Sequence, residues 1–227
     1  MIKKTILRKF NFLLAGLLFC TMVNSQTSPG CGCDYYGVSA CLNDTVFNGG
    51  DFLTVCYEVS DLINSSLGVN QDICGVRVDF THSLVYGVEM YLSSPSGQSI
   101  QLVGPYVDIE IDDQYGTTFG TNWGVTFVPS NQTPNPDPGI LPQWTNAQVW
   151  LSSATYNGSY FPSGPDGLES INGSANGQWC VQIDNTNLIQ PYTGRILDFE
   201  VIFCDVGGLP CCMADAGELV YNDTDVS

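Results

Sequence analysis

Acidic side chains are concentrated in residues 108–113, which read Asp-Ile-Glu-Ile-Asp-Asp. In an extended chain, Asp108, Glu110 and Asp112 lie on one face, and Asp113 follows at the turn. Like charges at such close spacing destabilise a strand unless water or a metal ion neutralises them. Calcium binds several oxygen ligands, often from acidic loops. The segment is therefore a candidate calcium site, and a merely solvated acidic edge is the favoured alternative.

Nucleophilic catalysis by a Ser-His-Asp or Cys-His arrangement would have to use His82, the only histidine in the chain. His82 lies between Thr81 and Ser83 at the end of a predicted strand, and no nucleophile-elbow motif surrounds any serine. We therefore expect His82 to be a structural turn residue. The chain is predicted not to be an enzyme and not to hydrolyse peptides or glycosides.

The first 25 residues have the organisation of a secretory signal peptide. Lys3, Lys4, Arg8 and Lys9 form the charged start, and an apolar run too short to span a bilayer follows. Cleavage is expected after Ser25. The mature protein is then secreted or displayed at the cell surface, without membrane insertion.

Cysteines behind a signal peptide predict disulfides, because the destination is oxidising. The chain has ten cysteines, and loss of Cys20 with the signal leaves an odd number. The remaining nine are Cys31, Cys33, Cys41, Cys56, Cys74, Cys180, Cys204, Cys211 and Cys212. An unpaired cysteine and the module-like sequence after Cys211 suggest the N-terminal part of a longer protein. For the Cys31–Cys33 pair, stapling is favoured over metal binding, because no histidine or second pair is nearby in sequence.

One disulfide is predicted specifically, between Cys180 and Cys204. Residues 178–184 and 195–204 alternate apolar and polar side chains, and we expect them to be consecutive antiparallel strands. A register that pairs the two cysteines brings their Cβ atoms within about 4.5–5.5 Å. A register slip of one residue would separate them, and Cys74 is the alternative partner of Cys204.

The breaks at Gly, Asn, Ser and Pro clusters in the rest of the chain predict an all-β fold, with a β-sandwich at 72–204. A disulfide-rich N-terminal extension at 26–71 precedes it and includes a strand at 52–59; residues 205–227 form a linker and the start of a following module. The middle, 104–176, is rich in loops and in aromatic residues. These aromatics are Trp123, Phe127, Trp144, Trp150, Tyr156 and Tyr160. They either plug the ends of the sandwich or form a platform on which sugar rings stack.

Four ordered motifs resemble the P domain (Homo B domain) that follows the protease domain in proprotein convertases and many bacterial subtilases. They are a strand ending in Thr81-His82, a second strand entering Ser94-Pro95-Ser96-Gly97, a Gly177-Gln178-Trp179 strand ending in Asp184, and a last strand begun by Gly194. The resemblance covers roughly residues 72–204 and implies a jelly-roll-like β-sandwich with a non-catalytic binding or stabilising role. The aspartate that usually follows the histidine is absent, since Tyr86-Gly87-Val88 stands there.

The charge of the chain limits its partners. The formal net charge is −17, and removing the four basic residues of the signal peptide makes it −21, with Arg77 and Arg195 the remaining bases. Such a surface repels phosphate backbones, so nucleic acid is not an expected partner. The expected partners are an extracellular protein or glycan ligand, or other domains of the same longer chain.

Two functions are consistent with these observations. The first is an interaction or stabilising module of a secreted or cell-surface protein, an adhesin. The cysteine-rich tail after Cys211 and the acidic composition rich in Asn, Gly and Thr resemble large surface proteins of gliding bacteria that use type IX secretion. The alternative is an accessory P domain of a secreted protease whose catalytic domain lies beyond residue 227.

Overall fold

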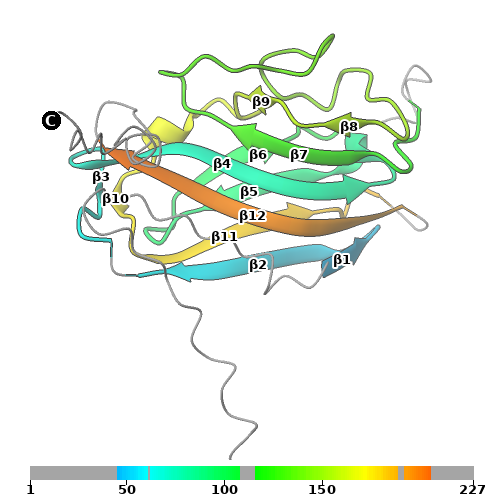
Figure 1. Cartoon of the computed structure of the whole chain (residues 1–227). Coiled ribbons are helices and arrows are strands. Elements are labelled where there is room, and N and C mark those ends of the chain that lie inside the picture. Colours follow the sequence, from blue (N-terminus) through cyan, green and yellow to red (C-terminus); the bar gives the residue numbers. More distant parts are fainter. Residues whose placement is uncertain (1–44, 61, 108–115, 189–191, 206–227) are drawn as a thin grey trace, which may run out of the picture.

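Two β-sheets pack face to face in a computed structural model that describes residues 45–60, 62–107, 116–188 and 192–205 (Figure 1). The described part is all-β apart from two 3-10 turns, η1 (Val85–Gly87) and η2 (Leu168–Ser170). The fold is thus a jelly-roll-like β-sandwich, as the alternating pattern predicted. Within the described residues, no helix has the length and apolar character to span a membrane.

The larger sheet has eight strands, built around β4 (Gln71–His82) and β12 (Thr193–Asp205). These two strands pair antiparallel along nearly their whole length. The order is β1-β12-β4-β3-β10, with β7 on β4 and both β8 and β9 on β7. The smaller strands are β1 (Thr45–Asn48), β3 (Ser66–Leu67), β7 (Asn122–Phe127), β8 (Thr155–Tyr156), β9 (Ser159–Tyr160) and β10 (Gly173–Ser174).

The smaller sheet has four antiparallel strands in the order β2-β11-β5-β6. They are β2 (Phe52–Val59), β11 (Gly177–Asp184), β5 (Glu89–Ser93) and β6 (Ser99–Val103). The turn from β5 to β6 runs through Pro95 to Gly97, and Gly97 has a positive φ of 80°. Glycine adopts this backbone conformation without the steric conflict that a Cβ atom would cause.

The core lies between the two sheets and is built from the side chains that alternate inward along each strand. On β4 these are Val76, Val78 and Phe80, which are fully buried. On β11 and β12 they are Trp179, Val181, Ile183, Phe199, Val201 and Phe203, also fully buried. The predicted strands and their inward faces are therefore confirmed.

The sandwich begins before residue 72, the position at which the sequence predicted its start. β2 is a full strand of the smaller sheet, and β1 lies at the edge of the larger one. The turn between them, stabilised by the Asp51 carboxylate accepting the backbone N–H of Asn48 at 2.8 Å, carries the chain from one sheet to the other. Part of the expected extension therefore supplies core strands. Cys31, Cys33 and Cys41, the signal peptide and the C-terminal segment after residue 205 lie outside the described residues.

The predicted disulfide between Cys180 and Cys204 is wrong. The structure instead joins Cys56 to Cys180 and Cys74 to Cys204. β11 and β12 are consecutive in sequence but belong to different sheets, so their cysteines are not cross-strand neighbours. Cys180 lies directly opposite Cys56 of β2, with the two Cα atoms 4.1 Å apart, the close spacing of a pair that shares no backbone hydrogen bonds.

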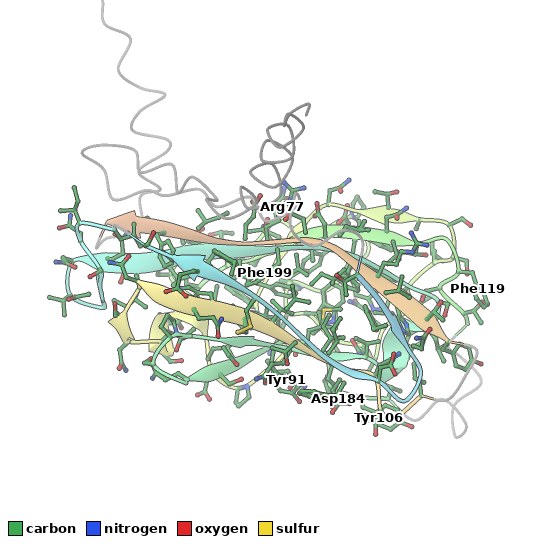
Figure 2. All side chains as sticks on the ribbon, turned by 90° about the horizontal axis from the view of Figure 1, so that it is seen from below. Arg77, Tyr91, Tyr106, Phe119, Asp184 and Phe199 are labelled. Atoms are coloured by element: carbon green, nitrogen blue, oxygen red, sulfur yellow. A yellow bond between two sulfur atoms is a disulfide. The ribbon has the colours of Figure 1, made fainter. Side chains whose placement is uncertain are left out.

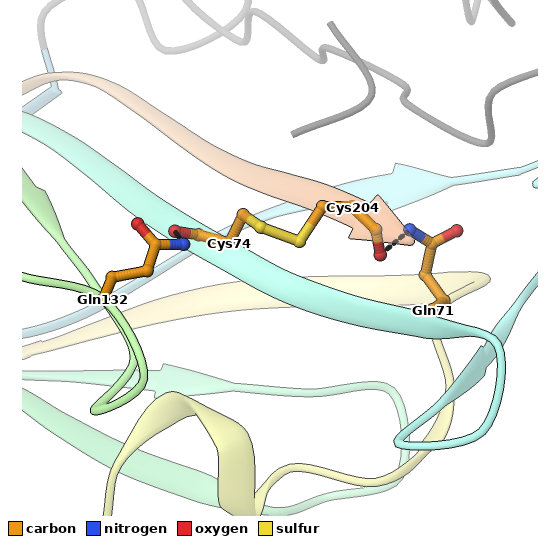
Figure 3. Close-up of a disulfide and its surroundings, with 4 residues drawn as sticks. All are labelled: Gln71, Cys74, Gln132 and Cys204. Carbon is orange, nitrogen blue, oxygen red and sulfur yellow. Dashed lines mark hydrogen bonds between the residues drawn. A yellow bond between two sulfur atoms is a disulfide. The ribbon is translucent and has the colours of Figure 1, made fainter. Parts of the chain in front are cut away.

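The second disulfide, which was the alternative pairing, crosses between β4 and β12 (Figure 3). Gly75 pairs with Ile202 and Ile73 with Phe203, so Cys74 is the extra residue of a β-bulge. Two glutamine side chains stabilise its surroundings. Gln132 donates a hydrogen bond to the Cys74 carbonyl at 3.0 Å, and Gln71 donates one to the Cys204 carbonyl at 2.6 Å (Figure 3).

Candidate functional site

The predicted calcium ligands Asp108, Glu110, Asp112 and Asp113 lie outside the described residues. Their calcium site stays a prediction. Among the residues that the structure does describe, no three His, Cys, Asp or Glu side chains are placed to hold a metal ion.

His82 is buried at the end of β4, where it packs against an aromatic ring and a glycine. Its imidazole stacks on Phe47 with ring centroids 5.4 Å apart. A Cβ atom at Gly194 would lie 2.4 Å from the imidazole and 2.3 Å from the Phe47 ring, so only glycine fits there. His82 Nδ1 accepts the backbone N–H of Leu84 at 3.0 Å, which fixes the turn into η1.

The second imidazole nitrogen of His82, Nε2, is buried beside the Asn185 side chain, which is also buried. Hydrogen bonding by Asn185 raises the pKa of His82 by less than burial lowers it. Burial lowers the pKa of His82 to about 4, so the ring is neutral at physiological pH. The neighbouring Ser83 hydroxyl accepts the backbone N–H of Thr193 at 2.9 Å. These contacts give His82 a structural place between β4 and β12.

The aromatic residues of the middle segment form a buried cluster. Trp144 and Trp150 stack with ring centroids 4.6 Å apart, and Tyr156 meets Trp150 edge-on at 4.8 Å. Trp123 stacks on Phe80 of β4 at 4.9 Å. All are buried, so the alternative of a sugar-stacking platform at these loops is wrong and core packing is correct. Aromatic pairs in such offset or edge-on arrangements add to the stability that burial provides.

Half-exposed polar and aromatic side chains gather instead on the outer face of the four-stranded sheet. We call this group the Tyr91 patch; it consists of Glu89, Tyr91, Gln101, Tyr106 and Asp184. Tyr91 stands opposite Gln101 of β6, and Glu89 stands opposite Asp184 of β11. Figure 2 shows Tyr91, Tyr106 and Asp184 on the same side of the sandwich. Cross-strand register therefore brings together residues from three strands and one loop.

Hydrogen bonds hold the side chains of the Tyr91 patch in place. The Gln101 amide donates to the Glu89 carboxylate at 2.7 Å and to the Tyr91 hydroxyl at 3.1 Å. The same Glu89 oxygen accepts the backbone N–H of Tyr106 at 3.4 Å. Partial burial raises the pKa of the Tyr91 phenol, and the negative charges of Glu89 and Asp184 raise it further. Tyr91 is therefore a neutral hydroxyl on a negatively charged face.

The positive charges lie on the other side of the molecule. Arg77 and Arg195 project from the outer face of the eight-stranded sheet, where Arg77 binds the Asp79 carboxylate at 2.8 Å. Figure 2 shows Arg77 on the side opposite Tyr91 and Asp184. Because the chain has no lysine after Lys9 and both described arginines lie on the other sheet, the Tyr91 patch has no basic side chain of its own among the described residues. The patch therefore repels anions and is suited to neutral or cationic ligands.

A shallow cleft of about 240 Å³ adjoins the patch. Its lining combines apolar and hydrogen-bonding side chains, namely Pro105, Leu141, Gln143, Trp144, Thr145 and Ser163. The Ser163 hydroxyl donates to the Gln101 carbonyl at 3.4 Å, and Pro105 immediately precedes Tyr106. These two contacts place the cleft next to the strand and the loop that carry Gln101 and Tyr106. Mixed linings of this kind are typical of sites for small polar ligands.

Sequence reasoning missed the patch. Its signal was present in the outward positions of the strand at 88–92, where Glu89 and Tyr91 alternate with buried residues. Which polar side chains stand beside them depends on pairing with β6 and β11, and that pairing is not visible from local sequence.

Comparison with known proteins adds little to this description. No protein-family model matches the chain, and no curated protein does either. Two similar solved structures are the crystal structures of the serine protease of Aeromonas sobria and of that protease in complex with its chaperone. Each is 10% identical, with a TM-score of 0.28, and the match covers 68% of this chain. It covers 27% of the matched chain, so this protein spans about a quarter of that length.

Proposed function

We propose that this chain is a non-catalytic extracellular interaction module, of the kind found in adhesins, and that it binds a neutral carbohydrate through the Tyr91 patch. The observation that carries the proposal is the hydrogen-bonded row of Glu89, Gln101 and Tyr91 on an open sheet face. A sugar ring presents C–H groups on its faces and hydroxyls around its edge. Tyr91 provides a surface for the faces, while the carboxylate and amide groups pair with the hydroxyls.

The negative charge of the Tyr91 patch limits the class of ligand that it would bind. Two carboxylates and no base make the patch unfavourable for sulfated, sialylated or phosphorylated ligands. A neutral saccharide meets no such repulsion, and its hydroxyls donate to Glu89 and Asp184. The adjoining cleft of about 240 Å³ would accept one sugar unit beside the ring that stacks on Tyr91. Calcium binding by Asp108, Glu110, Asp112 and Asp113 is a separate proposal, which the acidic sequence of residues 108–113 supports.

The arrangement favours binding over catalysis. His82 is buried among Phe47, Leu84 and Gly194, far from an exposed surface, and four cysteines of the described part are in disulfides. Glu89 and Asp184 are opposed carboxylates, as glycoside hydrolysis requires, but they lie on an open face rather than around an enclosed cleavage site. We therefore propose a lectin-like role without turnover.

A titration with neutral saccharides tests this function. The oxidised chain from residue 26 onward is titrated with neutral oligosaccharides of glucose, galactose, mannose and N-acetylglucosamine by calorimetry, and reducing ends are measured afterwards. We expect saturable binding to one class, no new reducing ends, and loss of binding in Tyr91→Ala. Phe119→Ala, which removes an exposed aromatic ring at one end of the sandwich, is the matched control (Figure 2). Binding that survives Tyr91→Ala contradicts the proposal.

The P-domain resemblance of the four sequence motifs favours a second role, that of a stabilising domain for a secreted protease. If this second role is correct, the protein expressed from the whole natural reading frame hydrolyses casein. A serine-protease inhibitor blocks that hydrolysis. An adhesin of the type IX secretion class yields no proteolysis and is found on the cell surface. Immunolabelling of intact cells, together with the casein assay, separates the two roles.

A further inference from the structure

Within the described residues, the outer edge of β2 is a long strand edge whose backbone is not paired. β2 lies at the end of the four-stranded sheet and pairs with β11 on one side only. The short Cα distance between Cys56 and Cys180 marks a pair without backbone hydrogen bonds, so Cys56 directs its N–H and C=O away from β11. Because the direction of the backbone groups alternates along a strand, Phe52, Thr54 and Glu58 also direct their N–H and C=O groups away from β11. Among the described residues, no hydrogen bond to these outward backbone groups is found.

Other strand edges in the described part are short or covered. β1 has four residues, and β3, β8, β9 and β10 have two each. β6 is covered by a loop, since Ser163 and Gly164 donate backbone hydrogen bonds to Leu102 and Gln101 at 3.1 and 3.0 Å. Proteins usually protect exposed edges in such ways, because a bare edge attracts further strands.

Side chains protect the edge of β12 where it extends past β1. There the Phe199 N–H binds the Asp198 carboxylate at 2.9 Å, and the Val201 N–H binds the Tyr57 hydroxyl at 3.0 Å. β2 has none of these protections. It is eight residues long, pairs with β11 in unbroken register, and contains no proline, glycine or lysine.

We infer that the β2 edge is a docking site for an extended, basic segment of another protein, which adds to the four-stranded sheet as a fifth strand. This goes beyond the carbohydrate role, because it uses a different surface and a protein partner. In strand addition, main-chain hydrogen bonds supply affinity and alternate side chains supply specificity. The four outward-facing residues of β2 provide the donors and acceptors for such bonds.

The chemistry of β2 indicates what the partner must carry. On the outer face, Glu58 is exposed and Phe52 is 59% exposed, so a lysine or arginine beside Glu58 and an aliphatic or aromatic contact to Phe52 are favoured. On the inner side, Leu53 and Tyr57 are partly buried against the core and would contact apolar residues of the added strand. The partner is therefore a segment in which basic and apolar residues alternate.

Charge argues against a second copy of this chain as the occupant. With the signal peptide removed, each copy carries a net charge of −21, and Glu58 of each copy would approach the acidic surface of the other. Repulsion of this size opposes self-association, whereas a basic segment is attracted by the same field.

Fluorescence anisotropy with a synthetic peptide tests the inference. The probe is a labelled octapeptide of alternating lysine and valine, blocked at both ends, added to the oxidised chain from residue 26. We expect saturable binding that becomes at least about tenfold weaker in Thr54→Pro. Proline at an outward-facing edge position keeps the native hydrogen bonds to β11 but blocks the added strand. Thr54→Val, which retains the N–H, is the matched control and should bind like the wild type.

A second probe distinguishes strand addition from simple charge attraction. The same octapeptide with every backbone amide N-methylated keeps its side-chain charge but loses the backbone donors of both strand edges, so its binding to the wild type should be at least about tenfold weaker. The comparison of the two peptides also tests the inference if the Thr54→Pro variant does not fold. Equal binding of both peptides, or no binding of either, overturns the inference. A wild-type dimer in sedimentation that Thr54→Pro dissociates also overturns it, because a second copy then occupies the edge. Saccharide binding should be unchanged in Thr54→Pro, and peptide binding should be unchanged in Tyr91→Ala, so the two functions fail separately.

Discussion

Acidification should destabilise this protein through His82 before most carboxylates are protonated. An unfolded histidine has a pKa near 6.5, and burial lowers the pKa of His82 to about 4 in the folded protein. At pH values between these two pKa values, His82 is protonated in the unfolded chain but stays neutral in the folded chain. The free energy of unfolding therefore falls as the pH is lowered. The contribution is complete above pH 6.5 and is lost as the pH approaches about 4. The whole difference corresponds to about 3 kcal/mol.

The loss of stability at an intermediate pH can be measured by comparison with a variant whose side chain at position 82 does not titrate. At pH 5, linkage gives a loss of about 2 kcal/mol relative to pH 7.5 from His82 alone. His82→Asn places a carboxamide oxygen near the position of Nδ1, where it can still accept the Leu84 N–H. Urea unfolding of the oxidised wild type and of this variant is compared at both pH values.

The free energy of unfolding is measured against pH for both proteins, and the difference between the two curves gives the contribution of His82. This holds because both proteins share the same carboxylates. We expect the wild type to lose about 2 kcal/mol more than His82→Asn between pH 7.5 and pH 5. Equal losses in the two proteins would refute the reasoning, since they would mean that His82 is protonated as easily in the folded chain as in the unfolded one.

Three further predictions concern the disulfides, a tight backbone contact and the acidic segment. Replacing Cys56 and Cys180 together by serine removes a cross-link between residues 124 positions apart and should lower the free energy of unfolding by about 4–5 kcal/mol in urea titrations. Gly194→Ala puts a methyl group against the Phe47 and His82 rings and should cost about 1–3 kcal/mol, seen as a lower Tm. Millimolar calcium should raise the Tm relative to chelator, and Asp112→Asn with Asp113→Asn should abolish the difference; an unchanged difference contradicts a calcium site there.

The strands were predictable from sequence because alternation is a local property. Residues 76–80 of β4 and 179–183 of β11 each bury every second side chain, and the core face was read directly from that pattern. Pairing is not local. The connection at 185–192 carries the chain from one sheet to the other, whereas its turn residues predicted a hairpin. The error in pairing Cys180 with Cys204 follows from that assumption alone.

The candidate site was harder to predict than the fold. Glu89 and Tyr91 read as outward residues, but their neighbours Gln101 and Asp184 are supplied by strands 12 and more than 90 positions away in sequence. The sequence favoured a core role for the conspicuous aromatics, Trp144 among them, but left a surface role open. Only packing against Phe80 and Phe127 decides for the core.

The two disulfides give the chain an unusual tolerance of cleavage. Both join a cysteine in the first third of the chain to one in the last third, Cys56 to Cys180 and Cys74 to Cys204. A single cut anywhere between residues 75 and 179 therefore leaves two fragments connected by two covalent bonds. The loops that carry the aromatic cluster lie within this interval, so an extracellular protease that nicks them releases nothing. The nicked protein runs as one band on a gel without reductant and as two bands with it, while the two fragments remain joined by the disulfides.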